Sequence, residues 1–109
     1  MKSLLIILIS IFFNLAASAQ DNNSVDCIIL QDENSIVCKY THIRTSEDRS
    51  ILMRWIEPDG LVTRQKDVVI PALHGSVYDY RYINGRTKGK WTFKVIDNDQ
   101  EYTANFIIE

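Results

Sequence analysis

The sequence predicts an all-β protein, an antiparallel β-sandwich of about seven strands, in the part of the chain that follows residue 19. Apolar and polar residues alternate there in short runs, and turn-forming residues separate these runs at intervals of about 8–12 residues. No stretch of about 11 or more residues beyond position 19 has a convincing helical period. A chain of this size without helices buries a core only between two facing sheets, which predicts the sandwich.

Residues 1–19 have the three parts of a secretory signal peptide. Lys2 gives a positive start, residues 4–15 are almost entirely apolar, and small residues at positions 17 and 19 suit a signal peptidase. The apolar run is shorter than the roughly 20 residues that a transmembrane helix needs. No cysteine follows it directly, which argues against a lipid anchor of the bacterial lipoprotein type. We expect cleavage before Gln20 and a periplasmic or secreted protein.

Cleavage leaves a flexible polar N-terminus over residues 20–24 and a single domain over residues 25–109. The 109-residue chain has 12 basic and 14 acidic side chains, a formal net charge of −2. Loss of Lys2 leaves 11 basic and 14 acidic side chains, so the mature charge is −3. This size and charge exclude a multidomain protein, a polytopic membrane protein and an electrostatic nucleic-acid binder. We expect no nucleic-acid partner and no membrane span after cleavage.

The first two strands are expected over residues 25–30 and 35–43, joined by the polar turn over residues 31–34. A hairpin folded about the middle of this turn places Cys27 directly opposite Cys38. The same register pairs an acidic residue with a basic one beside the cysteines, which favours it.

The loop length decides how the two cysteines meet. Two-residue loops favour Gly or Asn, which Asp32 and Glu33 do not provide, so a four-residue loop is expected. Leu30 and Ser35 then form a hydrogen-bonded pair, and the cysteines occupy a non-hydrogen-bonded pair with Cα atoms about 4.5 Å apart. In an exported chain this geometry predicts a disulfide. Two reduced core thiols are the alternative, and the absence of a CxxC motif argues against a catalytic dithiol.

Two further strands flank a strong turn in the middle of the chain. The first covers residues 49–56, and its expected core face carries Ile51, Met53 and Trp55. Glu57-Pro58-Asp59-Gly60 forms the turn, because Pro fixes its own φ and Gly accepts a left-handed conformation. The second strand covers residues 61–70 and ends at a proline.

Residues 76–83 form a strand with two chemically different faces. One face carries Tyr78, Tyr80 and Tyr82, and the other carries Val77, Asp79, Arg81 and Ile83. In the ordinary interpretation the tyrosines belong to the core and the charged side chains face solvent. In the functional interpretation the tyrosines form an exposed row, which suits binding because tyrosine presents rigid contact area at small entropic cost. The exposed row would require burial of the opposite face, and the charged residues in mid-strand argue against that burial. The sequence leaves the choice between the two interpretations open.

The last two strands are expected over residues 90–96 and 102–108, with an acidic turn between them. Their expected core faces carry Trp91, Phe93, Val95, Tyr102, Ala104, Phe106 and Ile108. Asp97, Asp99 and Glu101 alternate as in a minimal calcium loop, but a calcium site needs about six to eight oxygen ligands. A turn with Asn98 or Asp99 in a left-handed conformation explains the segment more simply.

The second half of the chain resembles bacterial Ig-like modules of exported proteins. Arg54-Trp55 before the Pro-Asp-Gly turn, the strand Gly89-Lys90-Trp91-Thr92-Phe93-Lys94-Val95 and the closing Phe106-Ile107-Ile108 carry the resemblance, which covers roughly residues 51–109. It implies an Ig-like, fibronectin-III-like sandwich and a role in adhesion, assembly or ligand binding. The cysteine hairpin in the first half is not part of this pattern.

A basic loop follows the tyrosine strand. Arg86, Lys88 and Lys90 lie close together, with Arg81 on the preceding strand. On an acidic protein this local positive charge is a candidate contact for a phosphate, an acidic glycan or an acidic partner. A solvated hairpin tip is the simpler alternative.

Catalytic and metal chemistry is not expected. His42 and His74 lack metal-ligand spacing, and the chain has no nucleophile-elbow motif and no phosphate-cradling glycine loop. We therefore expect no cofactor, no bound metal and no enzyme activity.

The sequence thus favours an exported binding module whose partner is another envelope or extracellular protein. The alternative is binding of a glycan or small ligand through the tyrosine row and the basic loop. A secreted inhibitor or enzyme is a third interpretation. An exposed strand edge could also pair with a partner's strand.

Overall fold

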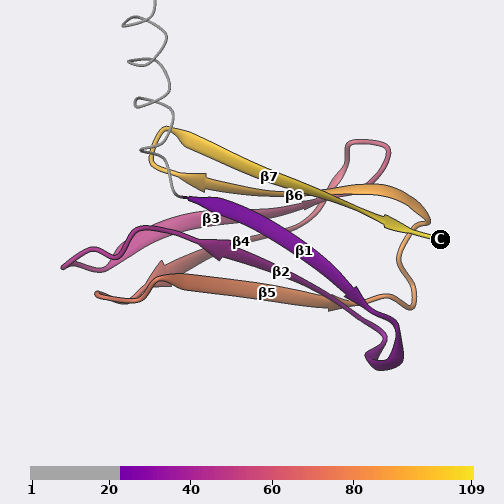
Figure 1. The fold of residues 1–109 in the computed structure, drawn as a ribbon. Coiled ribbons are helices and arrows are strands. Elements are labelled where there is room, and N and C mark those ends of the chain that lie inside the picture. The colour runs from indigo at the N-terminus through magenta and orange to yellow at the C-terminus, as the bar shows by residue number, and fades with distance from the viewer. Residues whose placement is uncertain (1–22) are drawn as a thin grey trace, which may run out of the picture.

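The computed structural model describes residues 23–109, so the expected signal peptide over residues 1–19 and its cleavage site lie outside the described residues. The described residues form seven strands in two antiparallel sheets (Figure 1). The three-stranded sheet has the order β1-β2-β5 and consists of β1 (Ser24–Leu30), β2 (Ser35–Thr41) and β5 (Ser76–Tyr82). The four-stranded sheet has the order β4-β3-β6-β7 and consists of β4 (Val62–Ile70), β3 (Arg49–Ile56), β6 (Gly89–Asp97) and β7 (Gln100–Ile108). The predicted all-β, seven-stranded sandwich is confirmed.

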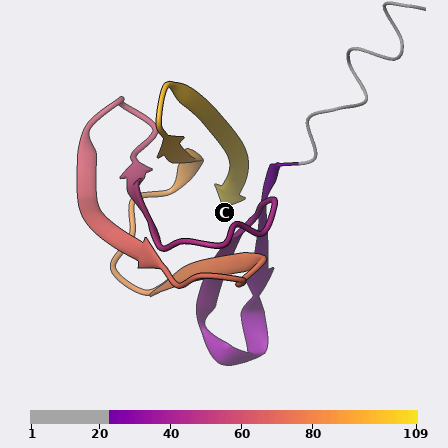
Figure 2. The same ribbon diagram turned by 90° about the vertical axis from the view of Figure 1, so that its left-hand side faces the viewer.

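The chain changes sheet three times, between β2 and β3, between β4 and β5, and between β5 and β6. Figure 2 shows the two sheets curving around a shared interior. Within residues 23–109, no helix is long and apolar enough to cross a membrane.

The first hairpin has the register that the sequence predicts. Cys27 pairs with Cys38 and Leu30 pairs with Ser35, across a four-residue connection that contains one 3₁₀ turn (Gln31–Glu33). Asn34 closes this turn in the left-handed region, at φ 54°. The predicted disulfide joins Cys27 to Cys38, whose Cα atoms are 4.1 Å apart, the short spacing expected of a non-hydrogen-bonded pair.

The core lies between the sheets and is dominated by aromatic side chains. Trp55 on β3 meets Phe93 edge-on with ring centroids 5.1 Å apart, and Trp91 stacks on Phe106 at 6.0 Å. The faces predicted for β3, β6 and β7 are confirmed, because their apolar members point inward. The buried apolar side chains of these three strands are Ile51, Met53, Trp55, Trp91, Phe93, Val95, Phe106 and Ile108.

The turn after β6 also agrees with its prediction, because Asn98 adopts a left-handed φ of 56°. Gly60, in the turn between β3 and β4, has φ 94°, a conformation that a side chain would strain. Both hairpins of the four-stranded sheet therefore depend on residues suited to positive φ.

The two sides of the sandwich close differently. On one side β1 packs against β7. On the other side β4 and β5 are the outermost strands of their sheets. Arg64 and Lys66 of β4 pair in register with the core residues Trp55 and Met53, so they point to the inner side of their sheet. This second side therefore carries charged side chains beside the apolar Val68, Ile70 and Val77, which pack in or against the core.

Candidate functional site

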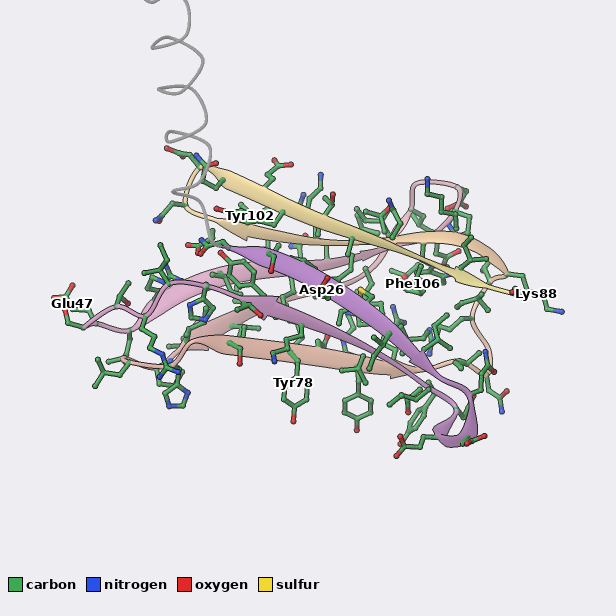
Figure 3. The ribbon with its side chains drawn as sticks, in the orientation of Figure 1. Asp26, Glu47, Tyr78, Lys88, Tyr102 and Phe106 are labelled. Carbon is green, nitrogen blue, oxygen red and sulfur yellow. A yellow bond between two sulfur atoms is a disulfide. The ribbon has the colours of Figure 1, made fainter. Side chains whose placement is uncertain are left out.

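The three tyrosines of β5 lie on the outer face of the three-stranded sheet. Tyr78, Tyr80 and Tyr82 are 65%, 49% and 56% exposed, whereas Asp79 between them is 5% exposed. Figure 3 shows the Tyr78 side chain pointing away from the other strands. The interpretation that places the tyrosines in the core is wrong, and the alternative of an exposed aromatic row is correct. The physical reason is that the inward-facing Asp79 finds partners on β3 and β4.

The strand register extends the tyrosine row across the whole sheet. Tyr80 lies opposite Val37, which lies opposite Ile28, and the three side chains form one apolar line over β5, β2 and β1. In the neighbouring row, Tyr82 lies opposite Ser35, which lies opposite Leu30. Tyr82 and Leu30 therefore extend the same surface. We call this surface the tyrosine face: Ile28, Leu30, Val37, Tyr78, Tyr80 and Tyr82.

Polar residues border the tyrosine face. Tyr78 lies opposite Lys39, which lies opposite Asp26, so a row with two opposite charges flanks the apolar line. The next row consists of Ser24, Thr41 and Ser76. An exposed apolar centre with a polar rim is the usual composition of a protein–protein contact surface.

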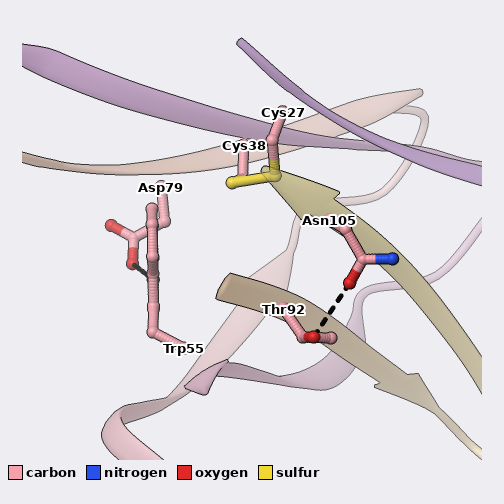
Figure 4. Close-up of a disulfide and its surroundings, with 6 residues drawn as sticks. All are labelled: Cys27, Cys38, Trp55, Asp79, Thr92 and Asn105. Atoms are coloured by element: carbon pink, nitrogen blue, oxygen red, sulfur yellow. Dashed lines mark hydrogen bonds between the residues drawn. A yellow bond between two sulfur atoms is a disulfide. The ribbon is translucent and has the colours of Figure 1, made fainter. Parts of the chain in front are cut away.

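Asp79 is the centre of a charged cluster at the open side of the sandwich. Its carboxylate accepts a 2.9 Å hydrogen bond from Nε1–H of Trp55, shown beside the disulfide in Figure 4. Arg64 Nε lies 3.2 Å from Oδ2, and Lys66 Nζ lies 3.5 Å from Oδ1. A buried carboxylate requires such partners, because an unpaired charge in the interior is strongly destabilising.

Arg81 extends inward from the same strand and covers the tryptophans. Its guanidinium carbon lies 5.6 Å from the Trp55 ring centroid and 6.0 Å from that of Trp91. It donates a 3.2 Å hydrogen bond from Nη1 to Thr63 Oγ1. Burial lowers the pKa of Arg81, and the nearby positive charges of Arg86 and Arg64 lower it further.

A cleft of about 300 Å³ opens between β4 and β5 beside these residues. Its cationic lining consists of Arg64, Lys66, Arg81 and Arg86, and Asp79 forms part of its wall. Tyr80 and Tyr82 reach it from the edge of the tyrosine face.

The residues of the predicted basic loop do not form one patch. Arg81 and Arg86 line the cleft, where Arg86 Nε donates to the backbone oxygen of Tyr82 at 3.2 Å. Lys88 is exposed at one end of the molecule (Figure 3). Lys90 pairs with Ile107 and lies on the outer face of the four-stranded sheet.

Asp97, from the acidic turn, is committed to a structural contact. Its Oδ2 accepts a 2.7 Å hydrogen bond from the hydroxyl of Tyr40 and lies 3.2 Å from Arg49 Nη2. Burial raises the pKa of the Tyr40 phenol, and the hydrogen bond to Asp97 raises it further. This contact ties β2 of one sheet to β3 and β6 of the other.

The two histidines lie apart from this cleft. His42 is buried against Tyr40, with ring centroids 5.2 Å apart, and its Nδ1 lies 3.1 Å from the backbone oxygen of Ile43. The backbone N–H of His74 donates to Pro71 O at 3.2 Å. In the described part of the chain no group of three or more His, Cys, Asp or Glu side chains is placed to hold a metal ion.

The sequence reasoning missed the contributions of β4 and of β1 and β2. Arg64 and Lys66 are an even number of positions from the buried Ile70 on the same strand. Because side chains alternate along a strand, this spacing predicts that all three point inward. Ile28 and Val37 alternate with the cysteines in the predicted hairpin, which was enough to place them on its outer face.

Comparisons with known proteins leave the family open. No protein-family model and no curated protein matches the chain. One solved structure that matches part of the chain is a beta-glucosidase from Kluyveromyces marxianus, with a TM-score of 0.44 and 8% sequence identity. The match covers 83% of this chain and 15% of the beta-glucosidase, so the chain spans less than a sixth of that protein's length.

Proposed function

We propose that this chain is an exported, Ig-like binding module that contacts another envelope or extracellular protein through its tyrosine face. The signal-peptide pattern of residues 1–19 and the Cys27–Cys38 disulfide both support export, because disulfides persist in oxidising compartments. The single observation that carries the proposal is the exposed apolar line of Ile28, Val37 and Tyr80.

The energetic argument rests on what the tyrosine face leaves in water. Ile28 is 55% exposed, and on the other side of Val37 lie three tyrosines that are each about half exposed or more. Scattered apolar side chains are ordinary on a protein surface, but a contiguous group with a polar rim marks an interaction site. Tyrosine is also enriched among the residues that contribute most to binding energy.

The chemistry of this face favours a protein over a glycan or a small molecule. Aliphatic Val37 on the central strand and Ile28 beside it form much of this face, where a sugar ligand would need hydrogen-bonding partners for its hydroxyl groups. A small molecule binds best in a concave pocket, whereas an outer sheet face matches another protein surface. The bordering Asp26 and Lys39 can fix the orientation of such a partner by charge.

The test compares the mature protein with two variants. Tyr80→Ala removes the central aromatic ring of the tyrosine face. Ile107→Ala is the matched control, because Ile107 is 59% exposed on the outer face of the other sheet. Each immobilised protein is used to capture proteins from the envelope of the cells that produce it, and any captured protein is then purified and titrated calorimetrically.

We expect one partner protein to bind the mature protein and Ile107→Ala equally well, and to bind Tyr80→Ala at least about tenfold more weakly. Equal binding to all three proteins would contradict the proposal. Retention of a glycan instead of a protein would contradict it too. A third contradicting result is a stable homodimer, detected by analytical sedimentation, that Tyr80→Ala converts to monomers. The tyrosine face would then bind a second copy of this chain and not another protein.

A further inference from the structure

The cleft between β4 and β5 is an unusual feature for the side of a sandwich. The inward positions of outer strands normally carry apolar side chains that close the core. Here β4 contributes Arg64 and Lys66, and β5 contributes Asp79 and Arg81, around a cavity of about 300 Å³. On the opposite side of the sandwich β1 packs against β7, and there the buried Val25 of β1 and Ile108 of β7 belong to the apolar core.

The charges around this cleft do not cancel. Its cations are Arg64, Lys66, Arg81 and Arg86. The nearby carboxylates are Asp79, in the wall, and Glu57, whose negative charge also acts on Arg81. Four cations and two carboxylates leave a formal balance of +2 in a partly enclosed space. Charges in such a space are screened less than charges on an open surface.

Arg81 also has an unused hydrogen-bond donor. Its Nη1 donates to Thr63, but its Nε is buried and has no acceptor among residues 23–109. A buried donor without a partner costs free energy, so in a native protein such a donor calls for an acceptor, for example a water molecule or an ion. Burial is the main cause of the lowered pKa of the Arg81 guanidinium, and repulsion by the neighbouring Arg86 and Arg64 lowers it further. An anion bound against this guanidinium group would relieve the repulsion.

We propose that this cleft binds a phosphate or sulfate group, held by the guanidinium groups of Arg81, Arg64 and Arg86. A tetrahedral oxyanion with two charges matches the +2 balance of the cleft. Arginine suits this ligand because its planar fork donates two parallel hydrogen bonds to neighbouring oxygens. This inference goes beyond the proposed protein contact, because it concerns a different group of residues and a different ligand chemistry.

The size of the cleft allows two sources of the anion. Its volume lies at the lower end of the range for small-molecule pockets. It can accept the free ion or the same group carried on a small molecule such as a sugar phosphate. Arg81 lies over Trp55 and Trp91, so binding should change tryptophan fluorescence directly.

The experiment titrates the mature protein with sodium phosphate, sodium sulfate, glucose 6-phosphate and glucose, with ionic strength held constant by sodium chloride. Tryptophan fluorescence and calorimetry are the two readouts. We expect saturable binding of the three anions and none of glucose. Equal affinity for phosphate and glucose 6-phosphate would assign the cleft to the free ion, and tighter binding of glucose 6-phosphate would assign it to the carried group. Both results support the proposal.

Two variants separate the cleft from general surface charge. Arg86→Gln removes one cation from the lining, and Lys88→Gln removes one cation from the same loop but outside the cleft. We expect Arg86→Gln to weaken anion binding at least tenfold and Lys88→Gln to weaken it less than twofold. Equal weakening by both variants, or no saturable response to any anion, would overturn the proposal. Thermal unfolding of both variants shows that each is folded during the titration.

Discussion

The indole Nε1–H of Trp55 donates a 2.9 Å hydrogen bond to the carboxylate of Asp79, and this contact joins the two sheets through their interior. Trp55 is fully buried on β3 and Asp79 is buried on β5. Because side chains alternate along a strand, burial of Asp79 turns Tyr78 and Tyr80 outward. The polar contact of Asp79 in the core is therefore coupled to the outward orientation of the tyrosine face.

Replacement of this carboxylate should destabilise the fold. Asp79→Ala leaves the Trp55 donor without its acceptor and leaves Arg64 and Lys66 without their counter-charge. We expect a loss of about 3 kcal/mol in the free energy of unfolding, near the lower end of the range for buried ion pairs, because both cations reach solvent. Urea denaturation measures the loss. Asp67→Ala is the control, because Asp67 is an exposed acid on β4, and it should change stability by less than about 0.5 kcal/mol. Equal losses for the two variants would contradict this role of Asp79.

Truncation of an outward tyrosine should have little effect on stability. Tyr80→Ala removes a half-exposed ring, and we expect it to cost less than about 1 kcal/mol. Phe93→Ala is the contrasting variant, because Phe93 is fully buried against Trp55, and it should cost about 3–5 kcal/mol. Thermal and urea unfolding measure both values. A large loss for Tyr80→Ala would show that the tyrosines belong to the core after all.

The first hairpin could be predicted residue by residue because its determinants are local. The turn over residues 31–34 and the two cysteines, 11 positions apart, fix one register, and the structure has that register. The core faces of β3, β6 and β7 were predictable for a related reason. Their large apolar side chains alternate in phase, and only one side of each strand can be buried favourably.

The orientation of β5 could not be predicted, because both of its faces are amphipathic. Tyrosine can be buried or exposed, and burial of Asp79 depends on cations that the chain supplies from β4. Those cations point inward because Arg64 and Lys66 pair in regular register with the inward-facing Trp55 and Met53 of β3. The parity of Arg64 and Lys66 with Ile70 indicates their side of the sheet, but their contact with Asp79 on a strand of the other sheet has no local signal.

The buried Tyr40 phenol should make stability depend on alkaline pH. Its pKa is raised in the folded state, so the folded protein holds this proton more tightly than the unfolded chain does. The contribution of Tyr40 is fully present below its unfolded pKa of about 10 and is lost as the pH rises above that value. We expect Tyr40→Phe to be less stable at neutral pH, by about 1–3 kcal/mol, because Asp97 loses a hydrogen bond.

The measurement is urea unfolding of both proteins at a series of pH values from neutral to above 10. The gap in stability between the mature protein and Tyr40→Phe should narrow at the alkaline end. Tyr78→Phe is the control, because the Tyr78 ring is exposed and its substitution should leave the pH profile unchanged. A gap that stays constant across the series would mean that the phenol does not titrate differently in the two states.

The Cys27–Cys38 disulfide should contribute measurably to the stability of the domain. It closes a loop between residues 11 positions apart, and the chain-entropy model assigns a cross-link of this kind about 3 kcal/mol. This is a large share of the stability of a small domain, which is typically about 5–15 kcal/mol. We expect the double variant Cys27→Ala/Cys38→Ala to unfold at lower urea concentration than the mature protein. Reductant should lower the midpoint of urea unfolding of the mature protein and leave that of the double variant unchanged.

Non-reducing mass spectrometry checks the bond directly, because the oxidised protein is two hydrogens lighter than the reduced one. Two free thiols in the protein isolated from its own compartment, or a midpoint insensitive to reductant, would contradict a structural role for this pair.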